Sequence, residues 1–297
     1  MQSSDEPQKV NAFGRGKGAI LNKEAKLTVK FWGVRGSIPC PGLAYHRYGG
    51  NTPCVEITCG DKTLIFDAGT GLRALGQELI KKGKIEAEIF FSHAHLDHII
   101  GFPFFAPAFN PKNNFKIWSV VFDKQIPIKE VFQKLTSSPM FPVSLEVFNA
   151  NLDFLTFKPG DKIELDGGIS LSTVALNHPQ GAVGYRVNFG GRSVCYITDT
   201  EHKAGEIDQN IKSLVSGSDL VIYDACFTDE NYPNFAGWGH STWQEGVKLC
   251  DAASVKKLVI FHHDPGNDDA AMDIISEEVN KARPGSLVAM EGMELEV

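Results

Sequence analysis

Histidine and aspartate side chains cluster directly after a short apolar run, and this cluster constrains the fold and chemistry more than any other segment. The run AEIFF ends at residue 91, and four polar side chains follow within six positions: His93, His95, Asp97 and His98. The chain of 297 residues contains nine histidines, so chance does not account for three of them here. Imidazole and carboxylate groups suit divalent cations, and side chains in a loop at a strand end can point into one pocket. The cluster therefore predicts a metal site at the end of a strand.

Further ligands must come from other parts of the chain, because four side chains of this kind cannot complete the shells of two metals. Three later apolar runs end in suitable side chains: STVALNH in His178, VCYITD in Asp199, and LVIFH in His262. A polar residue at such a position is also typical of an ordinary strand cap. His263 competes with His262, but successive strand residues point to opposite sides, so we expect only His262 in the pocket.

Alternating apolar residues predict that ordered structure begins with a strand from Leu27 to Val34. Strand patterns follow at 54–59 and 63–69, and apolar residues at helical spacing predict a covering helix over 71–82. Runs of strands with interspersed helices continue to the C-terminus. This order favours an α/β fold in which helices cover two sheets.

Two alternating runs around Gly190 and Gly191 predict a β-hairpin, because glycine can take positive φ at both positions of a tight turn. No fixed-period repeat and no linker rich in Pro, Gly or Ser divides the rest of the chain. We therefore predict a disordered N-terminal tail over residues 1–26 and one domain over residues 27–297.

Composition and charge limit the classes of protein to which the chain can belong. No apolar run approaches the roughly 20 residues of a membrane helix, so we expect no membrane span. The N-terminus lacks the apolar core of a secretory signal, and the six cysteines form no CxxC pair, so we expect a cytoplasmic protein with free cysteines. The net charge of −7 disfavours binding of long nucleic acids but permits a small anion at a local metal centre.

The segments SHAHLDH, LNH, YITDT and LVIFH resemble, in this order, the successive metal motifs of the metallo-β-lactamase superfamily. The resemblance extends over nearly the whole chain after the tail and implies an αββα four-layer sandwich. It also implies two ligand sets with one shared carboxylate: His93, His95 and His178 on one metal, Asp97, His98 and His262 on the other, and Asp199 bridging both. In the upstream segment DAGTG, Asp67 resembles a strand-end aspartate that supports the metal loop.

The implied ligand set requires two divalent metal ions. We expect Zn, with Mn or Fe as alternatives, because all three accept nitrogen and oxygen ligands. Metals about 4 Å apart can hold a bridging water whose pKa falls toward about 7, which supplies a hydroxide nucleophile at cellular pH. The resemblance thus implies a two-metal hydrolase domain in which Asp97 is a catalytic residue as well as a ligand.

The segment GWGHSTWQEGV resembles the His-Ser-Thr segment of the phosphodiesterase branch, which RNase Z and small cyclic phosphodiesterases share. The resemblance implies that His240 is a catalytic acid and not a ligand, and that Asp224 in VIYDACF orients it. A histidine of near-neutral pKa can protonate the alkoxide that phosphodiester cleavage releases. Taken without the resemblance, His240 is equally well explained as a loop residue before the helix N-cap Ser241.

Hydrolysis of a small anionic phosphodiester, such as a cyclic nucleotide, is the function that we predict. An RNase Z-like RNA endonuclease is the first alternative, although the chain shows no long basic arm for a folded RNA. A glyoxalase II-like thioester hydrolase shares the ligands but does not require the GHSTW segment, and a β-lactamase carries Cys at the place of Asp199. A sensor that uses the metal only for stability would lack ligands, and none is missing. Homodimerisation is a further expectation from the resemblance.

Overall fold

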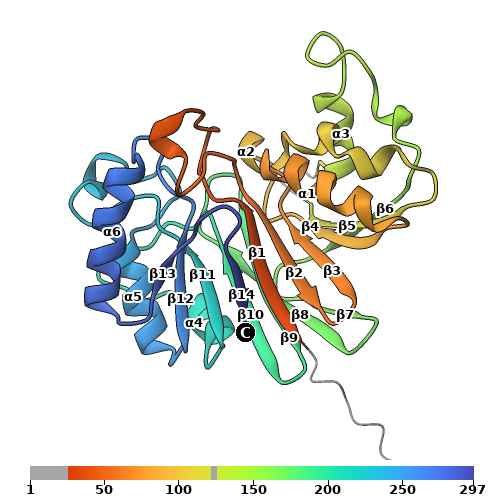
Figure 1. The fold of residues 1–297 in the computed structure, drawn as a ribbon. Coiled ribbons are helices and arrows are strands. Elements are labelled where there is room, and N and C mark those ends of the chain that lie inside the picture. The colour runs from red at the N-terminus through yellow and green to blue at the C-terminus, as the bar shows by residue number, and fades with distance from the viewer. Residues whose placement is uncertain (1–25, 122–125) are drawn as a thin grey trace, which may run out of the picture.

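Two seven-stranded β-sheets face each other, and helices cover the outer face of each sheet (Figure 1). The computed structural model describes residues 26–121 and 126–297. Its order of layers, helix, sheet, sheet and helix, is the α/β sandwich that the sequence predicts. The tail predicted for residues 1–26 lies, up to residue 25, outside the described residues.

The first sheet is mixed and combines strands of the N-terminal half with the last strand of the chain. Its order is β14, β1, β2, β3, β4, β5, β6. Neighbours from β3 to β6 are parallel, and the other pairs are antiparallel. The strands span β1 Leu27–Gly33, β2 Cys54–Cys59, β3 Lys62–Phe66, β4 Glu86–Phe90, β5 Asn114–Val120, β6 Asn151–Phe157 and β14 Glu294–Glu296.

The second sheet is also mixed, in the order β13, β12, β11, β10, β9, β8, β7. Neighbours from β10 to β13 are parallel, whereas β7 to β10 are antiparallel. The strands span β7 Lys162–Leu165, β8 Ile169–Leu176, β9 Ala182–Phe189, β10 Arg192–Ile197, β11 Leu220–Asp224, β12 Lys257–Phe261 and β13 Leu287–Val288. Every residue of β11 is buried, as expected for a parallel strand covered on both faces.

The residues that the structure describes include six α-helices and several short 3-10 turns between the elements. The α-helices span α1 Gly71–Leu79, α2 Leu96–Ile99, α3 Ile128–Leu135, α4 Gln209–Val215, α5 Trp243–Ala252 and α6 Asp269–Ala282. The 3-10 turns span Leu43–Tyr45, Ile80–Lys82, Phe102–Phe104, Ala106–Phe109, Leu145–Val147 and Tyr232–Asn234. In Figure 1, α1 and α3 lie outside the first sheet and α5 and α6 outside the second.

Three apolar clusters separate the four layers. The cluster between the sheets includes Phe31 and Phe66 from the first sheet and Tyr196 from the second. Leu75 of α1 belongs to a second cluster on the outer face of the first sheet, and Ile275 of α6 to a third on the outer face of the second. The amphipathic pattern of each element therefore fixes which sheet it covers.

Most of the elements predicted from the sequence lie where the patterns place them. β9 and β10 form the predicted hairpin, and both Gly190 and Gly191 in its turn have positive φ. All six cysteines are buried and free. Among the described residues, no helix is both long enough and apolar enough to cross a membrane.

Candidate metal centre

Polar residues predicted from the sequence follow strands whose carboxyl ends meet at one edge of the sheets. His262 directly follows β12, Asp224 is the last residue of β11, and Asp199 lies two residues after β10. These three strands are parallel neighbours, so their carboxyl ends lie side by side. His178 follows β8, which runs in the direction of β10 because both are antiparallel to β9.

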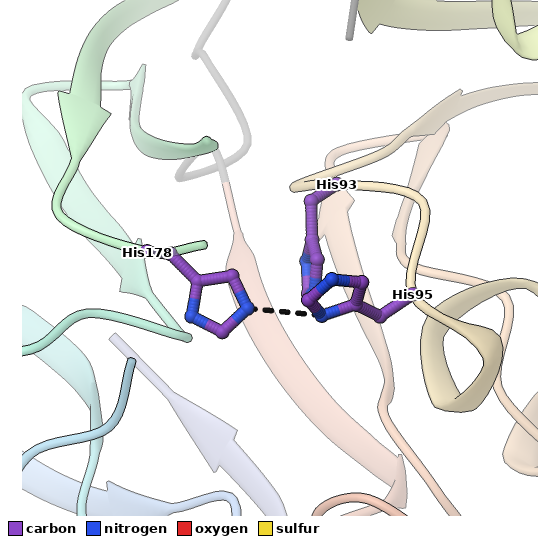
Figure 2. Close-up of side chains that lie close together, drawn as sticks. All are labelled: His93, His95 and His178. Carbon is purple, nitrogen blue, oxygen red and sulfur yellow. Dashed lines mark hydrogen bonds between the residues drawn. The ribbon is translucent and has the colours of Figure 1, made fainter. Parts of the chain in front are cut away.

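Three histidines from two distant segments face one another (Figure 2). His93 and His95 lie in the loop after β4, and His178 lies in the loop after β8. One ring nitrogen from each lies within 4.8 Å of the other two. His178 Nε2 is 3.0 Å from His95 Nδ1. The opposite ring nitrogens are held by other groups, since His95 Nε2 lies 2.8 Å from Gln180 Oε1 and His178 Nδ1 lies 2.8 Å from the Gly239 carbonyl oxygen.

The hydrogen bonds of these rings leave lone pairs that point toward a common position. Because an amide oxygen and a carbonyl oxygen only accept hydrogen bonds, neutral His95 is protonated on Nε2 and neutral His178 on Nδ1. Their facing nitrogens then carry lone pairs and cannot bond to each other. His93 Nε2 is also buried, and it has no hydrogen-bond partner within the part of the chain that the structure describes. These three nitrogens fit a divalent cation.

Asp97, His98 and His262 form a second group beside the first. His98 Nε2 lies 3.3 Å from His262 Nε2, and each of these nitrogens lies 3.3 Å from Asp97 Oδ2. The backbone N–H of Ser37 donates to the same carboxylate oxygen at 2.8 Å and fixes its position. All three side chains are buried, so their charges and lone pairs are withheld from water.

Asp199 lies between the two groups and directs one oxygen toward each. Its Oδ1 lies 3.6 Å from His93 Nε2 and 3.9 Å from His178 Nε2. Its Oδ2 lies 3.2 Å from His98 Nε2 and 3.5 Å from His262 Nε2. The structure therefore brings all seven sequence-predicted ligand residues together, with this carboxylate at the centre.

Asp67 supports the loop that carries the first predicted ligands. Its Oδ2 accepts the Nδ1 proton of His98 at 2.8 Å, so the Nε2 lone pair of His98 faces the centre. The Ser92 backbone N–H donates to Oδ1, and the Ser92 and Tyr196 hydroxyls donate to Oδ2, each at 2.8 Å. The geometry agrees with the supporting role that the resemblance implies for Asp67.

His240 lies at the edge of the centre and is held by Asp224. Its Nδ1 lies 3.1 Å from Asp224 Oδ2 and 3.9 Å from Asp199 Oδ1. Burial lowers the pKa of His240, but the carboxylates of Asp224 and Asp199 outweigh it and raise the pKa to about 9. Asp224 is itself fixed by the backbone N–H of Thr200 at 3.0 Å. The sequence-predicted pair is therefore in contact.

The carboxylates of the centre favour a positive charge among them. Burial lowers the pKa of His98, but Asp199, Asp97 and Asp67 together raise it well above its ordinary value. Burial raises the pKa of Asp97, but His98 and His262 hold it below its usual range. A cation bound at this position supplies the positive charge that the carboxylates favour.

Left-handed backbone is concentrated at the centre. Of the six non-glycine residues with positive φ among the described residues, five belong to the centre or contact it: Ser37, Asp67, Gln180, Asp199 and His262. Each such residue costs roughly 1–3 kcal/mol and persists only where the surroundings hold it in place. The backbone at these turns therefore adopts an unfavourable conformation that places the side chains at the centre.

The structure also settles which residues lie outside the centre and adds some that the sequence analysis missed. His263 points away, with Nε2 2.8 Å from the Ala289 carbonyl oxygen, as expected from strand alternation. The contacts of Ser37, Gln180 and Tyr196 have no motif in the sequence, because they are made by chain segments that only folding brings to the ligands. Gln180 offers one weak signal, its position two residues after His178.

Comparison with known proteins identifies the family. The family described as "Beta-lactamase superfamily domain" matches residues 62–263, which is more than half of the chain. The chain belongs to the beta-lactamase superfamily. This match includes all the predicted ligands, and it confirms the resemblance on which the sequence-based assignment rests.

Individual relatives of this superfamily member are distant but cover nearly all of it. Ribonuclease Z of Archaeoglobus fulgidus is 21% identical over an alignment of 321 positions, which covers 91% of this chain and 97% of the relative. The metallo-beta-lactamase fold protein YhfI from Bacillus subtilis superposes with a TM-score of 0.69 at 19% identity, covering 92% and 100% of the two chains. A diphosphatase from the PhnP family superposes with a TM-score of 0.67 at 20% identity, covering 91% and 98%. These likenesses confirm the metallo-β-lactamase fold.

Proposed function

We propose that this beta-lactamase superfamily protein is a two-metal phosphodiesterase that hydrolyses a small anionic phosphodiester, such as a cyclic nucleotide. The contact between His240 Nδ1 and Asp224 Oδ2, at 3.1 Å, carries the proposal. It places an imidazole that is held by a carboxylate beside the two groups of proposed ligands. Phosphodiester hydrolysis can use such an imidazole to protonate the leaving alkoxide. At the level of enzyme class, the prediction of a metal-dependent hydrolase is confirmed by the family and by relatives named Ribonuclease Z.

The proposed ligands follow the two groups around Asp199. We assign His93, His95 and His178 to one cation, Asp97, His98 and His262 to the other, and Asp199 to both. The division of the Asp199 oxygens between the two groups supports this assignment. When bound, two divalent cations lower the pKa of the water that they hold toward about 7 and neutralise charge on the phosphoryl group. Zn is our first choice, and Mn or Fe suit the same nitrogen and oxygen ligands.

The residues of the chain itself divide the remaining work of the reaction. Asp224 accepts the Nδ1 proton of His240, so the Nε2–H of the imidazolium is the group left to face a substrate. Although burial lowers the pKa of His240, the Asp224 carboxylate raises it and so favours the imidazolium, whose proton can pass to the leaving oxygen. Asp97 holds the position of the second group through His262 and the Ser37 N–H.

The choice of a small substrate rests on charge. A folded RNA is held by many Lys and Arg contacts to phosphates, whereas the net charge of this chain is −7. The named relatives support a second candidate, RNA endonuclease activity of the Ribonuclease Z kind. A glyoxalase II-like thioester hydrolase would use the ligands but would leave the His240–Asp224 pair without a role.

Three further predictions remain: one domain over residues 27–297, a homodimer and a cytoplasmic location. The six free buried cysteines support a reducing compartment.

Elemental analysis and a substrate screen test the proposal together. We expect two metals per chain after reconstitution, loss of both in Asp199→Ala, and faster hydrolysis of cyclic mononucleotides or linear dinucleotides than of precursor tRNA. A value that stays at one metal per chain would contradict the two-metal assignment. Faster cleavage of precursor tRNA than of every small phosphodiester would favour the endonuclease, and hydrolysis of thioesters alone would reject both candidates.

A further inference from the structure

Glu201 carries a half-buried carboxylate beside the metal centre, and the proposed reaction gives it no role. It lies two residues after Asp199, and its side chain contacts the loop between β11 and α5. Three donors of that loop meet its two oxygens. The Tyr232 hydroxyl donates to Oε1 at 2.8 Å, the Gly237 N–H donates to Oε1 at 2.6 Å, and the Gly239 N–H donates to Oε2 at 2.9 Å.

The loop held in this way carries His240 and supports His178. Gly237 and Gly239 both have positive φ, near 90°, so this segment is a turn that does not hold its shape through regular secondary structure. The Gly239 carbonyl oxygen accepts the Nδ1 proton of His178, and the next residue is His240. One residue, Gly239, therefore links the Glu201 carboxylate to a proposed ligand through its carbonyl oxygen and precedes the proposed acid in the chain.

The backbone of Glu201 is fixed on the opposite side by the loop after β8. Its N–H donates to the Asn177 carbonyl oxygen at 2.7 Å, and the Asn177 side-chain amide donates to the Glu201 carbonyl oxygen at 2.8 Å. Asn177 precedes His178 in the chain. Glu201 thus joins three segments at one point: the loop after β8, the loop after β10 and the loop before α5.

The close packing of Gly239 explains why the turn must be held accurately. A Cβ atom at Gly239 would lie 2.3 Å from His178 Nδ1 and 2.4 Å from Pro179 Cδ. The backbone therefore lies directly against the imidazole, and a small displacement of the turn moves both His178 and His240. A misplacement of about 1 Å in such a site can lower a rate by about 10²-fold.

We propose that Glu201 is a positioning residue, which sets the place of His240 and the orientation of His178 by binding the two glycine N–H groups of the 237–239 turn. The proposal rests on the proposed function for its effect on turnover. Its structural part, the hold on the turn, does not depend on that function.

Amide hydrogen exchange tests the hold on the turn directly. In metal-free protein, Glu201→Ala should speed exchange of the Gly237 and Gly239 amides about 10-fold or more, because both lose their acceptor. Glu201→Gln should give a smaller effect, since its amide oxygen still accepts from the donors at one of the two oxygen positions. Glu206→Gln is the matched control, because Glu206 lies in the same segment and its side chain makes no hydrogen bond to the turn among the described residues.

Kinetics of the metal-loaded enzyme test the consequence. Measured at saturating metal, Glu201→Ala should lower kcat for a small phosphodiester about 10-fold or more with little change in KM, and Glu201→Gln should recover part of it. Tyr232→Phe, which removes one donor and keeps the ring, should lie between Glu201→Gln and wild type. Wild-type exchange rates in Glu201→Ala, or accelerated exchange with unchanged kcat, would overturn the proposal. A wild type without phosphodiesterase activity would instead refute the proposed function, and exchange would still decide whether Glu201 holds the turn.

Discussion

Single side chains in this centre are defined by what their second polar atom contacts. His98 is directed by Asp67, His178 by the Gly239 carbonyl, and His240 by Asp224, and in each case the partner fixes which ring nitrogen carries the proton. Such supporting partners affect metal affinity or activity by about 10–100-fold when removed. Single substitutions can therefore test which residues are ligands and which residue is the proposed acid.

His240→Ala should lower kcat for the small phosphodiester about 10²-fold or more while both metals remain bound, because the variant loses a proton donor and no ligand. Turnover and elemental analysis on the same preparation measure the two quantities. His46→Ala is a suitable control, since His46 is exposed and belongs to none of the groups of possible metal ligands among the described residues. Loss of metal from the His240 variant would show that His240 is a ligand.

Asp224→Asn should change the pH dependence of turnover as well as its rate. The Asp224 carboxylate raises the pKa of His240, so its neutralisation lowers that pKa. If protonated His240 is the acid, activity is lost as pH rises through its pKa, and in the variant this loss must occur at lower pH. We expect kcat to fall about 10-fold at neutral pH with the metals retained. An unmoved alkaline limb in the kcat profile would contradict the assignment.

At the scale of elements, the centre is assembled where loops after strands of both sheets meet. The loop after β1 approaches the loop after β12, since Gly36 N–H donates to the His263 carbonyl oxygen at 2.9 Å. The same loop provides the Ser37 N–H that fixes Asp97. This loop contains none of the proposed ligands, yet it contacts the segments that carry two of them, Asp97 and His262.

Gly36→Ala should weaken metal binding about 10-fold or more, because its Cβ would lie 2.5 Å from His262 Nδ1 and displace that ring. Competition with a metal chelator measures the affinity, and circular dichroism checks that the fold is retained. Leu43→Ala, in the same loop and 91% exposed, provides the control. An unchanged affinity in the Gly36 variant would show that His262 does not bind the metal in its present position.

For the whole molecule, the relevant balance is between the net charge of −7 and a centre that attracts a local positive charge. A small phosphodiester makes few phosphate contacts, so its hydrolysis should change less than about threefold between 50 and 200 mM salt. A ligand with 6–10 phosphate contacts loses roughly 10³–10⁵ in affinity over that range. Salt titration of kcat/KM with a cyclic nucleotide and with precursor tRNA separates the candidates. A steep salt dependence with the cyclic nucleotide would contradict the small-substrate proposal.

Local patterns in the sequence were enough to predict the fold class, the strand ends and the seven residues that we propose as ligands. Apolar alternation and helical spacing depend on neighbours in the chain, and a polar residue that ends an apolar run is visible without any tertiary contact, as at Asp199 and His262. The order of the motifs resembles that of a known family, and this resemblance predicted which distant segments meet at the centre. The structure brings these residues together as predicted, whereas their roles as ligands stay a prediction.

The contacts that hold the proposed ligands became evident only in the folded structure. The Asp199 oxygens divide between two groups, Ser37 reaches Asp97 across 60 positions, and Glu201 fixes a turn that begins more than 30 positions later. These contacts join chain segments whose patterns carry no sign of each other. The physical reason is that a hydrogen bond to a backbone N–H places little demand on the sequence of the donor, so its partner becomes evident only when folding brings the two segments together.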